Sequence, residues 1–317
     1  MRNAFADELT RLAGEDPSIV LLSGDIGNRM FDRFKQHCPG RFFNCGIAEG
    51  NMMGMAAGMA LSALRPVVYT IAPFTTYRCY EQIRVDLCYH HLPVVIVGAG
   101  AGLTYARLGP THHSCEDLAV MRVLPGMTVF APADAPELRQ GLRALLARRG
   151  PAYIRIGKKG EPVVTDDAPE FRLGRARPLR RGRDLSLIGT GTLLSVLIEA
   201  AGLLERRGIS AAVEGFHTVK PLDGERLESI FSRYDAVVVA EEHSRLGGLG
   251  GAVAEWLAGR GPMRGRLRLL GTDDAFLHTT GGHRYARSCF GLSAEGIADQ
   301  AEEHLRHIRG AESMRRG

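Results

Sequence analysis

The sequence lacks the features that mark disulfide-rich, zinc-binding or membrane proteins. Among 317 residues there are six cysteines, and no two have the CxxC spacing typical of zinc sites and redox motifs. No apolar run approaches the roughly 18 residues that span a bilayer, and no apolar stretch like that of a signal peptide follows the first residues. These absences argue against a disulfide framework, a metal site and a membrane span, and they predict a protein of the reducing cytoplasm.

Charge of one sign is also not concentrated. The net charge is +5 and the pI about 9.0, yet Lys and Arg are scattered except between residues 172 and 183. We interpret that cluster as a solvated linker face. The pI is the only feature that suggests nucleic-acid binding, which would show as a salt-sensitive affinity for DNA. We therefore expect no nucleic-acid partner.

What the chain does contain is an alternation of short apolar runs with helical patterns. The runs are continuously apolar, which is typical of parallel strands covered by helices on both faces. A stretch rich in Gly, Pro, Asp and Arg interrupts the rhythm before LSLIGTG resumes it at Leu185. The sequence therefore predicts an α/β protein of two domains, each a mostly parallel sheet covered by helices, with bounds 1–165 and 185–317 and a linker at 166–184. The expected strands include IVLL (19–22), PVVYTIA (66–72), LPVVIVGAG (92–100), MTVFAPA (127–133) and AYIRIG (152–157).

One carboxylate stands alone in the stretch GIAEGNMMGMAAGMA. Glu49 follows the expected strand RFFNCGI and begins a helix of Gly, Ala and Met, at a strand-to-helix junction where ligands bind open α/β sheets. An acidic residue at a helix N-terminus can be a simple capping device. Here the small residues suit close packing against another chain or a cofactor. A carboxylate buried there would hold a proton more readily and could share it with a ligand nitrogen.

Two aromatic and imidazole-rich segments follow. Phe74, Tyr77 and Tyr80 recur at helical spacing in PFTTYRCYEQIRVDL, which fits either a core stripe or a platform for a flat heteroaromatic ring. His112 and His113 follow a Gly-Pro turn, and only one of the pair can face a given site. Their neighbours Cys115, Glu116 and Asp117 have no zinc-ligand spacing, so general acid/base work is the better functional interpretation.

The order of these motifs carries a resemblance. GIAE, then the aromatic segment ending EQIRVDL, then GPTHH, APAD and YIRIG, resembles the pyrimidine-binding domain of the transketolase family of thiamine-diphosphate enzymes. AEEHSRLGGLGGAVAE in the second domain is similar to the C-terminal domain of that family, and the resemblance extends to 1-deoxyxylulose-5-phosphate synthase. It implies a two-carbon ketol or acyl transferase of carbohydrate metabolism that uses thiamine diphosphate.

The resemblance also implies roles for single residues. Glu49 matches the glutamate that shares a proton with the cofactor's pyrimidine ring, and His112 matches the histidine that exchanges protons with substrate. The cofactor-binding set is Asp25, Glu49, Phe74, Tyr77 and Tyr80, and the substrate-binding set is His112, Arg155, which matches an arginine that meets a sugar phosphate, and Arg107, which either replaces a lost anion contact or faces solvent.

A motif of the family is missing. Full-length members carry GDG and a later Asn, which hold Mg2+ and the cofactor diphosphate, and this sequence contains no GDG. The chain therefore resembles the C-terminal half of a split transketolase. The resemblance implies that a separate N-terminal subunit holds the Mg2+, and that two copies of each chain form an α2β2 heterotetramer in which this chain dimerises.

Several positions depart from the sugar-phosphate enzymes. Leu108 stands where they carry an aspartate before GPTH, the loop GAGAGL (98–103) lacks the usual charged contact, and Gly50 replaces a frequent Gln. These departures predict an acceptor other than a standard pentose phosphate. In the second domain, isolated histidines such as His283 are expected to be satisfied polar residues rather than catalytic ones.

Two alternatives remain open. The β-subunit of a 2-oxo-acid dehydrogenase shares the two-domain plan, although LGPTHH and EQIRVDL are closer to transketolase. A non-catalytic scaffold could also keep the fold, although it would have no need of Glu49, the aromatic residues and His112 together.

Overall fold

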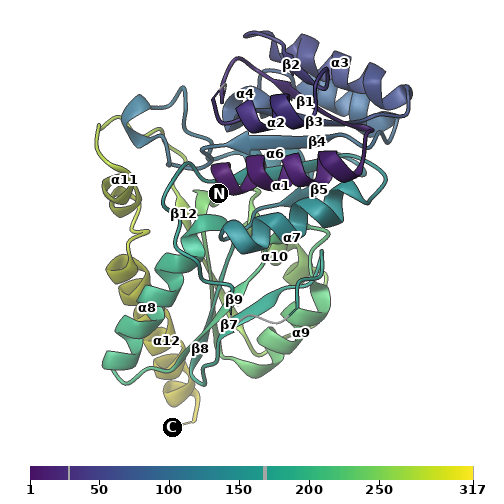
Figure 1. Cartoon of the computed structure of the whole chain (residues 1–317). Helices are drawn as coiled ribbons and strands as arrows, with labels where there is room; N and C mark the ends of the chain where they lie inside the picture. The colour runs from purple at the N-terminus through teal and green to yellow at the C-terminus, as the bar shows by residue number, and fades with distance from the viewer. Residues whose placement is uncertain (28, 167–169, 317) are drawn as a thin grey trace.

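The computed structural model describes residues 1–27, 29–166 and 170–316, which form two mostly parallel sheets, one above the other in Figure 1. The first sheet has the strand order β10-β5-β6-β4-β3-β1-β2, and every neighbouring pair is parallel except β10 with β5. Its strands are β1 (Ile19–Ser23), β2 (Phe42–Asn44), β3 (Arg65–Ile71), β4 (Val95–Ala99), β5 (Thr128–Phe130), β6 (Ala152–Ile156) and β10 (Thr218–Lys220).

Helices cover both faces of this sheet, as the continuous apolar runs predict. One face packs on α1, α2 and α7, and the other on α3, the π-helix η1 and α6. The bounds are α1 (Arg2–Glu15), α2 (Asp32–His37), α3 (Glu49–Leu61), α4 (Ala72–Thr76), α5 (Tyr80–Gln82), η1 (Ile83–Tyr89), the 3-10 helix η2 (Ala106–Leu108), α6 (Asp117–Arg122) and α7 (Ala135–Leu146).

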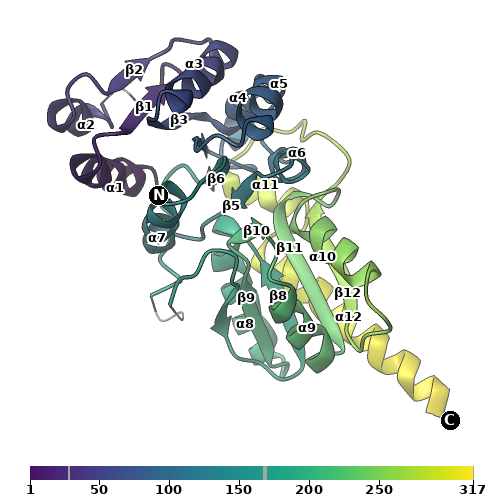
Figure 2. The same ribbon diagram turned by 90° about the vertical axis from the view of Figure 1, so that its right-hand side faces the viewer.

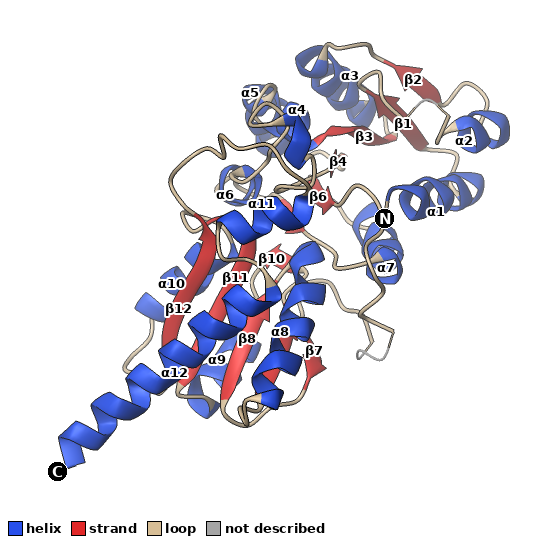
Figure 3. Cartoon of the chain, turned by 90° about the vertical axis from the view of Figure 1, so that its left-hand side faces the viewer, coloured by secondary structure: helices blue, strands red, loops and turns tan. Residues whose placement is uncertain are grey.

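The second sheet has the order β12-β11-β8-β9-β7, with β7 antiparallel at one edge. Helices α8 and α12 pack on one face and α9 and α10 on the other, and α12 extends past the sheet toward the C-terminus (Figure 3). The bounds are β7 (Arg177–Arg180), β8 (Leu185–Gly189), the 3-10 helix η3 (Gly191–Leu193), α8 (Leu194–Arg206), β9 (Ala211–Gly215), α9 (Gly224–Arg233), β11 (Ala236–Ser244), α10 (Leu249–Ala258), β12 (Arg266–Thr272), α11 (His283–Cys289) and α12 (Ala294–Arg316).

The fold class is as predicted. Strand β7 lies inside the predicted linker 166–184 and pairs with β9, so the second sheet already includes residues from Arg177 onward. The basic cluster is correspondingly not all solvated, because Arg177 is buried and pairs with Glu137 at 3.2 Å. Three of the predicted linker residues, 167–169, lie outside the described residues.

The two domains are joined by a shared sheet and a shared hydrophobic core. β10 follows β9 in the chain but pairs with β5, so a strand from the second half completes the edge of the first sheet (Figure 2). One hydrophobic core also runs from α3 and η1 of the first domain to α9 and α10 of the second. Within the described residues, no helix is both long and apolar enough to cross a bilayer.

The aromatic segment differs from the single helix that its spacing predicts. It is broken into α4, the short α5 and the π-helix η1, with Tyr77 and Arg78 in the turn between the first two. The turn at residues 77–79 separates Phe74 in α4 from Tyr80 in α5, so the three aromatic residues do not lie on one face of a continuous helix.

Candidate active site

Glu49 is the first residue of α3, and its side chain is buried. The residue is 1% exposed, and neither carboxylate oxygen has a hydrogen-bond partner within the described part of the chain. The nearest cation is Arg78, whose Nη1 lies 3.8 Å from Oε2. A buried carboxylate normally finds donors, because leaving one unpaired costs about 1 to 3 kcal/mol or more. Two free acceptors at the mouth of a helix therefore point to a ligand that supplies the donor.

A continuous set of contacts leads from Glu49 to His112. The guanidinium of Arg78 lies 5.1 Å from the centre of the Phe74 ring, and that ring meets the imidazole of His112 edge-on at 5.4 Å. The structure thus brings together three residues predicted from sequence, Glu49, Phe74 and His112. Arg78 was missed, although its spacing of four from Phe74 is the helical signal that could have identified it.

The His112 imidazole lies in an aromatic environment on the loop between β4 and α6. Its Nδ1 is 2.9 Å from Thr111 Oγ1, and Tyr105 packs on its other side at 5.9 Å between ring centres. Burial, and secondarily the neighbouring His113, lower the pKa of His112 below the usual value. The neutral imidazole is therefore the dominant form at neutral pH, and Nε2 is the nitrogen left to exchange a proton with a ligand.

The paired histidines point in different directions, and it is His113 rather than His112 that lines the cavity described below. His113 is buried, and its Nε2 lies 3.2 Å from the carbonyl of Ala106 within the same loop. Its contact holds the loop together, whereas His112 faces Phe74 and Tyr105.

Tyr77 and Tyr80 point in different directions. The hydroxyl of Tyr77 donates to Glu116 Oε2 at 2.8 Å and accepts from the Glu116 backbone N–H at 3.2 Å, and burial with nearby Asp117 and Glu116 raises its pKa. The hydroxyl of Tyr80 donates to the carbonyl of Val120, and its ring packs against the core. Phe74 and Tyr77 therefore lie at the site, while Tyr80 lies behind them.

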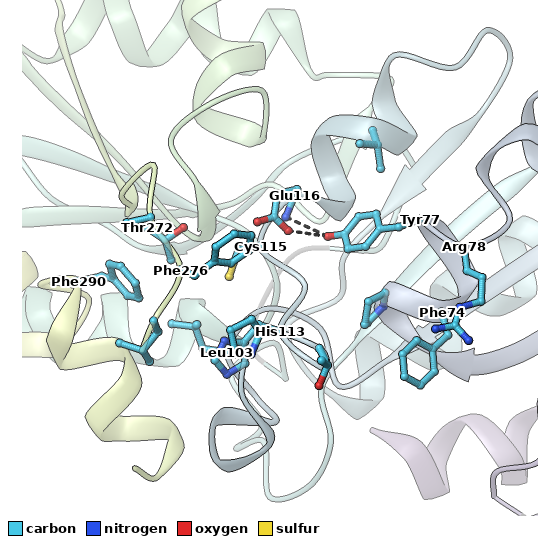
Figure 4. Close-up of a pocket in the computed structure, with 16 residues that line it drawn as sticks. Phe74, Tyr77, Arg78, Leu103, His113, Cys115, Glu116, Thr272, Phe276 and Phe290 are labelled. Carbon is cyan, nitrogen blue, oxygen red and sulfur yellow. Dashed lines mark hydrogen bonds between the residues drawn. The ribbon is translucent and has the colours of Figure 1, made fainter. Parts of the chain in front are cut away.

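A cavity of about 740 Å³ adjoins the aromatic residues and lies between the two domains (Figure 4). Phe74, Tyr77 and Arg78 form one end, and Phe276 and Phe290 of the second domain form the other. Neither Glu49 nor His112 lines it. The cavity therefore lies next to the carboxylate of Glu49 and the imidazole of His112 and does not enclose them.

The remaining predicted residues are spread along the carboxyl edge of the sheet. Asp25 follows β1, has φ +55° and accepts from Asn44 Nδ2 at 2.9 Å, and Arg107 is exposed in η2. Arg155 is buried in β6, where Nε bonds Asp117 at 2.9 Å and Nη2 bonds two backbone carbonyls. These contacts favour a structural role for Arg155 over the predicted phosphate contact. Lys158, just beyond β6, is exposed, with Nζ 4.6 Å from the Tyr105 ring centre, and was missed.

Close packing explains the glycines of the loop at 98–103. Gly100 has φ +72°, and a Cβ there would come within 1.8 Å of the Tyr105 ring. Gly102 has φ +63°, and a Cβ there would lie 2.5 Å from Glu242 Oε1. Only glycine fits both the backbone and the space, so these residues are required by the fold irrespective of the substrate. Gly50 is different, because a Cβ would meet nothing closer than 3.7 Å.

The part of the chain that the structure describes has no cluster of three or more His, Cys, Asp or Glu side chains that could hold a metal ion. Two carboxylate oxygens without a hydrogen-bond partner in the described residues, linked through Arg78 to the Phe74 ring, suit a flat heteroaromatic ring with a protonated nitrogen. The residues of this chain therefore fit the heteroaromatic ring of a cofactor.

Comparisons with known proteins agree with this geometry. Residues 1–161 match the family described as "Transketolase, pyrimidine binding domain", and residues 174–297 match "Transketolase, C-terminal domain". The chain is 38% identical over 304 residues to the 6-deoxy-6-sulfo-D-fructose transketolase subunit SqwH of Clostridium sp. (strain MSTE9), covering 96% of this chain and 94% of the relative. It is 36% identical to an apulose-4-phosphate transketolase subunit of Phocaeicola vulgatus, covering 96% of this chain and 97% of that relative.

A solved structure described as "Split gene transketolase, inactive beta4 tetramer" superposes with a TM-score of 0.86 at 37% identity, covering 96% of this chain and 97% of that one. The chain belongs to the transketolase family of transferases. The chain spans nearly the whole length of these split-transketolase subunits, to which it is similar, but 48% of a 1-deoxy-D-xylulose-5-phosphate synthase of Chlorobium luteolum. The 2-oxo-acid dehydrogenase alternative is not favoured.

Proposed function

We propose that this chain supplies the pyrimidine-activating half of a thiamine-diphosphate site and that Glu49 is its activating acid. The observation that carries the proposal is the buried, unpartnered carboxylate at the start of α3. Thiamine diphosphate, when bound, supplies the carbon nucleophile that accepts the two-carbon unit of a ketose donor. Glu49 would hold a proton at the pyrimidine ring nitrogen, and Phe74 and Tyr77 would pack against the ring.

His112 is proposed to move the substrate proton. Its lowered pKa keeps Nε2 an acceptor near neutral pH, so it can take a proton from a donor hydroxyl and return one to the acceptor oxygen. Asp25 and Tyr80 are proposed to act at a greater distance, Asp25 near the cofactor through its loop and Tyr80 by supporting the segment that carries Tyr77.

An anionic sugar is the proposed substrate class. One relative is named for 6-deoxy-6-sulfo-D-fructose and another for apulose-4-phosphate, and both names denote sugars with an anionic group. Lys158 and Arg107 are exposed cations near Tyr105 and His112 and could meet such a group. A Lys158→Gln variant is expected to raise KM for an anionic donor more than it lowers kcat, and an unchanged KM would remove Lys158 from the site.

The partner is proposed to be an N-terminal subunit with the GDG and Asn motif, which holds Mg2+ and the diphosphate in an α2β2 assembly. The exposed face of α3, opposite the buried face that includes Glu49, supports this. Leu61 on that face is 69% exposed, Ile47 just before the helix is 80% exposed, and a Cβ at Gly54 or Gly58 would meet nothing within 4 Å. The six free thiols support action in a reducing compartment such as the cytoplasm.

Calorimetry tests the proposal. Thiamine diphosphate with Mg2+ is titrated into this chain alone, into the partner alone and into the mixture. Saturable binding in the mixture alone, followed by ketol transfer from ketose phosphates or a sulfonated ketose, is the expected result. Absence of binding in the mixture would leave a scaffold role instead.

A further inference from the structure

The carboxylate of Glu242 lies where the two domains meet, and every oxygen of it is used. Glu242 is near the end of β11 and is 2% exposed. Its Oε1 accepts from the backbone N–H of Leu103 at 2.7 Å and from His283 Nε2 at 2.8 Å, and its Oε2 accepts from Arg287 Nε. Burial opposes ionisation, but Arg287 and His283 outweigh it and hold the pKa of Glu242 well below its usual value.

The first domain presents one backbone donor to this carboxylate, and that donor begins the loop that carries His112. Gly102 and Ser114 exchange backbone hydrogen bonds of 3.0 and 2.9 Å, which close the base of loop 103–113. Immediately inside this base, Leu103 N–H is bonded to Glu242. Farther along, the N–H of His112 donates to the carbonyl of Gly109 at 3.0 Å. The loop is therefore held at its base and braced internally up to His112.

The same junction is tied by Arg155. Its Nη2 donates to the carbonyl of Ser114 at 3.0 Å and to the carbonyl of Glu242 at 2.8 Å, so one guanidinium joins the base of the loop to β11. On the other side, Nη2 of Arg287 donates to Thr192 Oγ1 at 3.0 Å. The backbone and the side chain of Glu242 are thus both fixed, which makes its position a rigid reference for the loop.

We propose that Glu242 is a positioning residue for ketol transfer, acting from the C-terminal domain on His112 through loop 103–113. The inference rests on the role proposed above for His112. It gives the C-terminal domain a part in setting the active-site geometry of its own chain. A displacement of about 1 Å at a reacting group can lower a rate roughly 100-fold, so a small movement of this loop would be measurable.

Glu242→Gln in the complete complex with the N-terminal subunit is the test. Glutamine keeps the shape but turns an NH2 group toward either Arg287 or the Leu103 and His283 donors. We expect kcat for ketol transfer to fall roughly 10- to 100-fold, with less than about a twofold change in the Kd of thiamine diphosphate. Deuterium exchange at the reactive carbon of the cofactor, which needs Glu49 rather than His112, should keep its rate. Trypsin should cleave faster after Arg107, the exposed arginine of the loop.

Glu241→Gln is the matched control. Glu241 is the preceding residue on β11 and is equally buried, but its oxygens accept from Leu249 and Gly250 N–H at the start of α10 and do not touch the loop. It should leave kcat and cleavage after Arg107 unchanged. Arg287→Lys keeps the charge but loses the simultaneous contacts with Glu242 and Thr192, so it should reproduce a weaker form of the Glu242→Gln effect. It replaces Glu242→Gln in the test if Glu242→Gln does not fold.

The inference is overturned if Glu242→Gln keeps the wild-type kcat, if it slows exchange and transfer equally, or if Glu241→Gln behaves in the same way. These outcomes differ from a failure of the proposed function, in which the wild-type complex itself would show neither exchange at the cofactor nor ketol transfer.

Discussion

The start of α3 and the end of β11 both bury glutamates, and they treat them in opposite ways. Among the described residues, neither carboxylate oxygen of Glu49 has a hydrogen-bond partner, whereas both oxygens of Glu241 and of Glu242 accept from backbone, imidazole or guanidinium donors. All three are at most 2% exposed. The difference shows that burial alone does not mark a functional carboxylate. We propose that the carboxylate without donors, Glu49, binds a ligand, whereas the two bonded carboxylates hold parts of the protein in place.

The largest effect is expected from Glu49. Glu49→Gln removes the acid that shares a proton with the cofactor, so kcat with the partner subunit should fall roughly 100- to 10,000-fold, as for other general acids. The melting temperature should change little, because the carboxylate accepts no hydrogen bond within the described residues and its 3.8 Å ion pair is with the exposed side chain of Arg78. Steady-state kinetics and thermal unfolding measure both.

Glu228→Gln on α9 provides the exposed control. Glu228 pairs with Arg260 at 3.6 Å on the surface, so its substitution should change neither quantity. A Glu49→Gln complex with wild-type kcat would break the comparison, because the unpartnered carboxylate would then have no chemical role.

Glu241→Gln should show the reverse pattern. The carboxylate accepts from two N–H groups at the N-terminus of α10, and its loss should lower the free energy of unfolding by about 1 to 3 kcal/mol while kcat stays the same. Urea unfolding of the subunit measures the change. Unaltered stability would mean that the satisfied carboxylates do not hold α10 in place.

His217 is a further test of the comparison between buried polar groups with and without hydrogen bonds, because it too is buried. Within the described residues its Nε2 lacks a hydrogen-bond partner, and its ring packs against Phe130 and Phe171. Burial, with Arg177, lowers its pKa to about 3 from 6.5. A lowered folded pKa means that the unfolded chain binds the proton first, so stability is present above pH 6.5 and is lost as the pH falls toward 3.

Between pH 7 and pH 5 this histidine should account for about 2 kcal/mol of lost stability. His217→Gln should reduce the difference between unfolding curves at the two pH values, and His37→Gln, which replaces an exposed histidine, should not. An equal pH dependence in wild type and His217→Gln would show that this atom does not behave as a buried neutral group.

The smallest expected effect concerns helix glycines in the two domains. Nothing lies within 4 Å of a Cβ added at Gly58 of α3 or Gly202 of α8. Gly202→Ala should raise the free energy of unfolding by about 0.5 to 1 kcal/mol without other change. Gly58→Ala should stabilise the isolated chain similarly but weaken binding of the N-terminal subunit. Equal partner affinity in both variants would place the interface elsewhere than on α3.

The periodicity of the sequence was sufficient to predict the two mostly parallel sheets. The runs around Val67 and Val95 became parallel strands because their side chains are mostly apolar and buried on both faces of the sheet. Glu49 lies at the start of α3, and His112 lies on the loop between β4 and α6. The roles of these two residues remain proposals.

Other features could not be read from the chain. Arg155 bonds Asp117, Ser114 and Glu242, residues up to 87 positions away, and no local pattern contains that information. The break in the helix after Thr76 follows from tertiary packing of Tyr77 on Glu116 rather than from a Gly or Pro signal. The sequence of β7, RPLR, is typical of a linker because it is rich in Arg and contains Pro. Proline is nevertheless tolerated in an edge strand, which is what β7 forms beside β9.

The pairing of β10 with β5 has a consequence for the order in which the protein can be made. Synthesis proceeds from the N-terminus, and the residues of the first domain leave the ribosome well before Thr218–Lys220. Until that segment emerges, β5 has an open edge able to pair with a strand of another nascent chain. Completion of the first sheet therefore waits for translation of the second half, which couples the folding of the pyrimidine-binding domain to the chain that follows it.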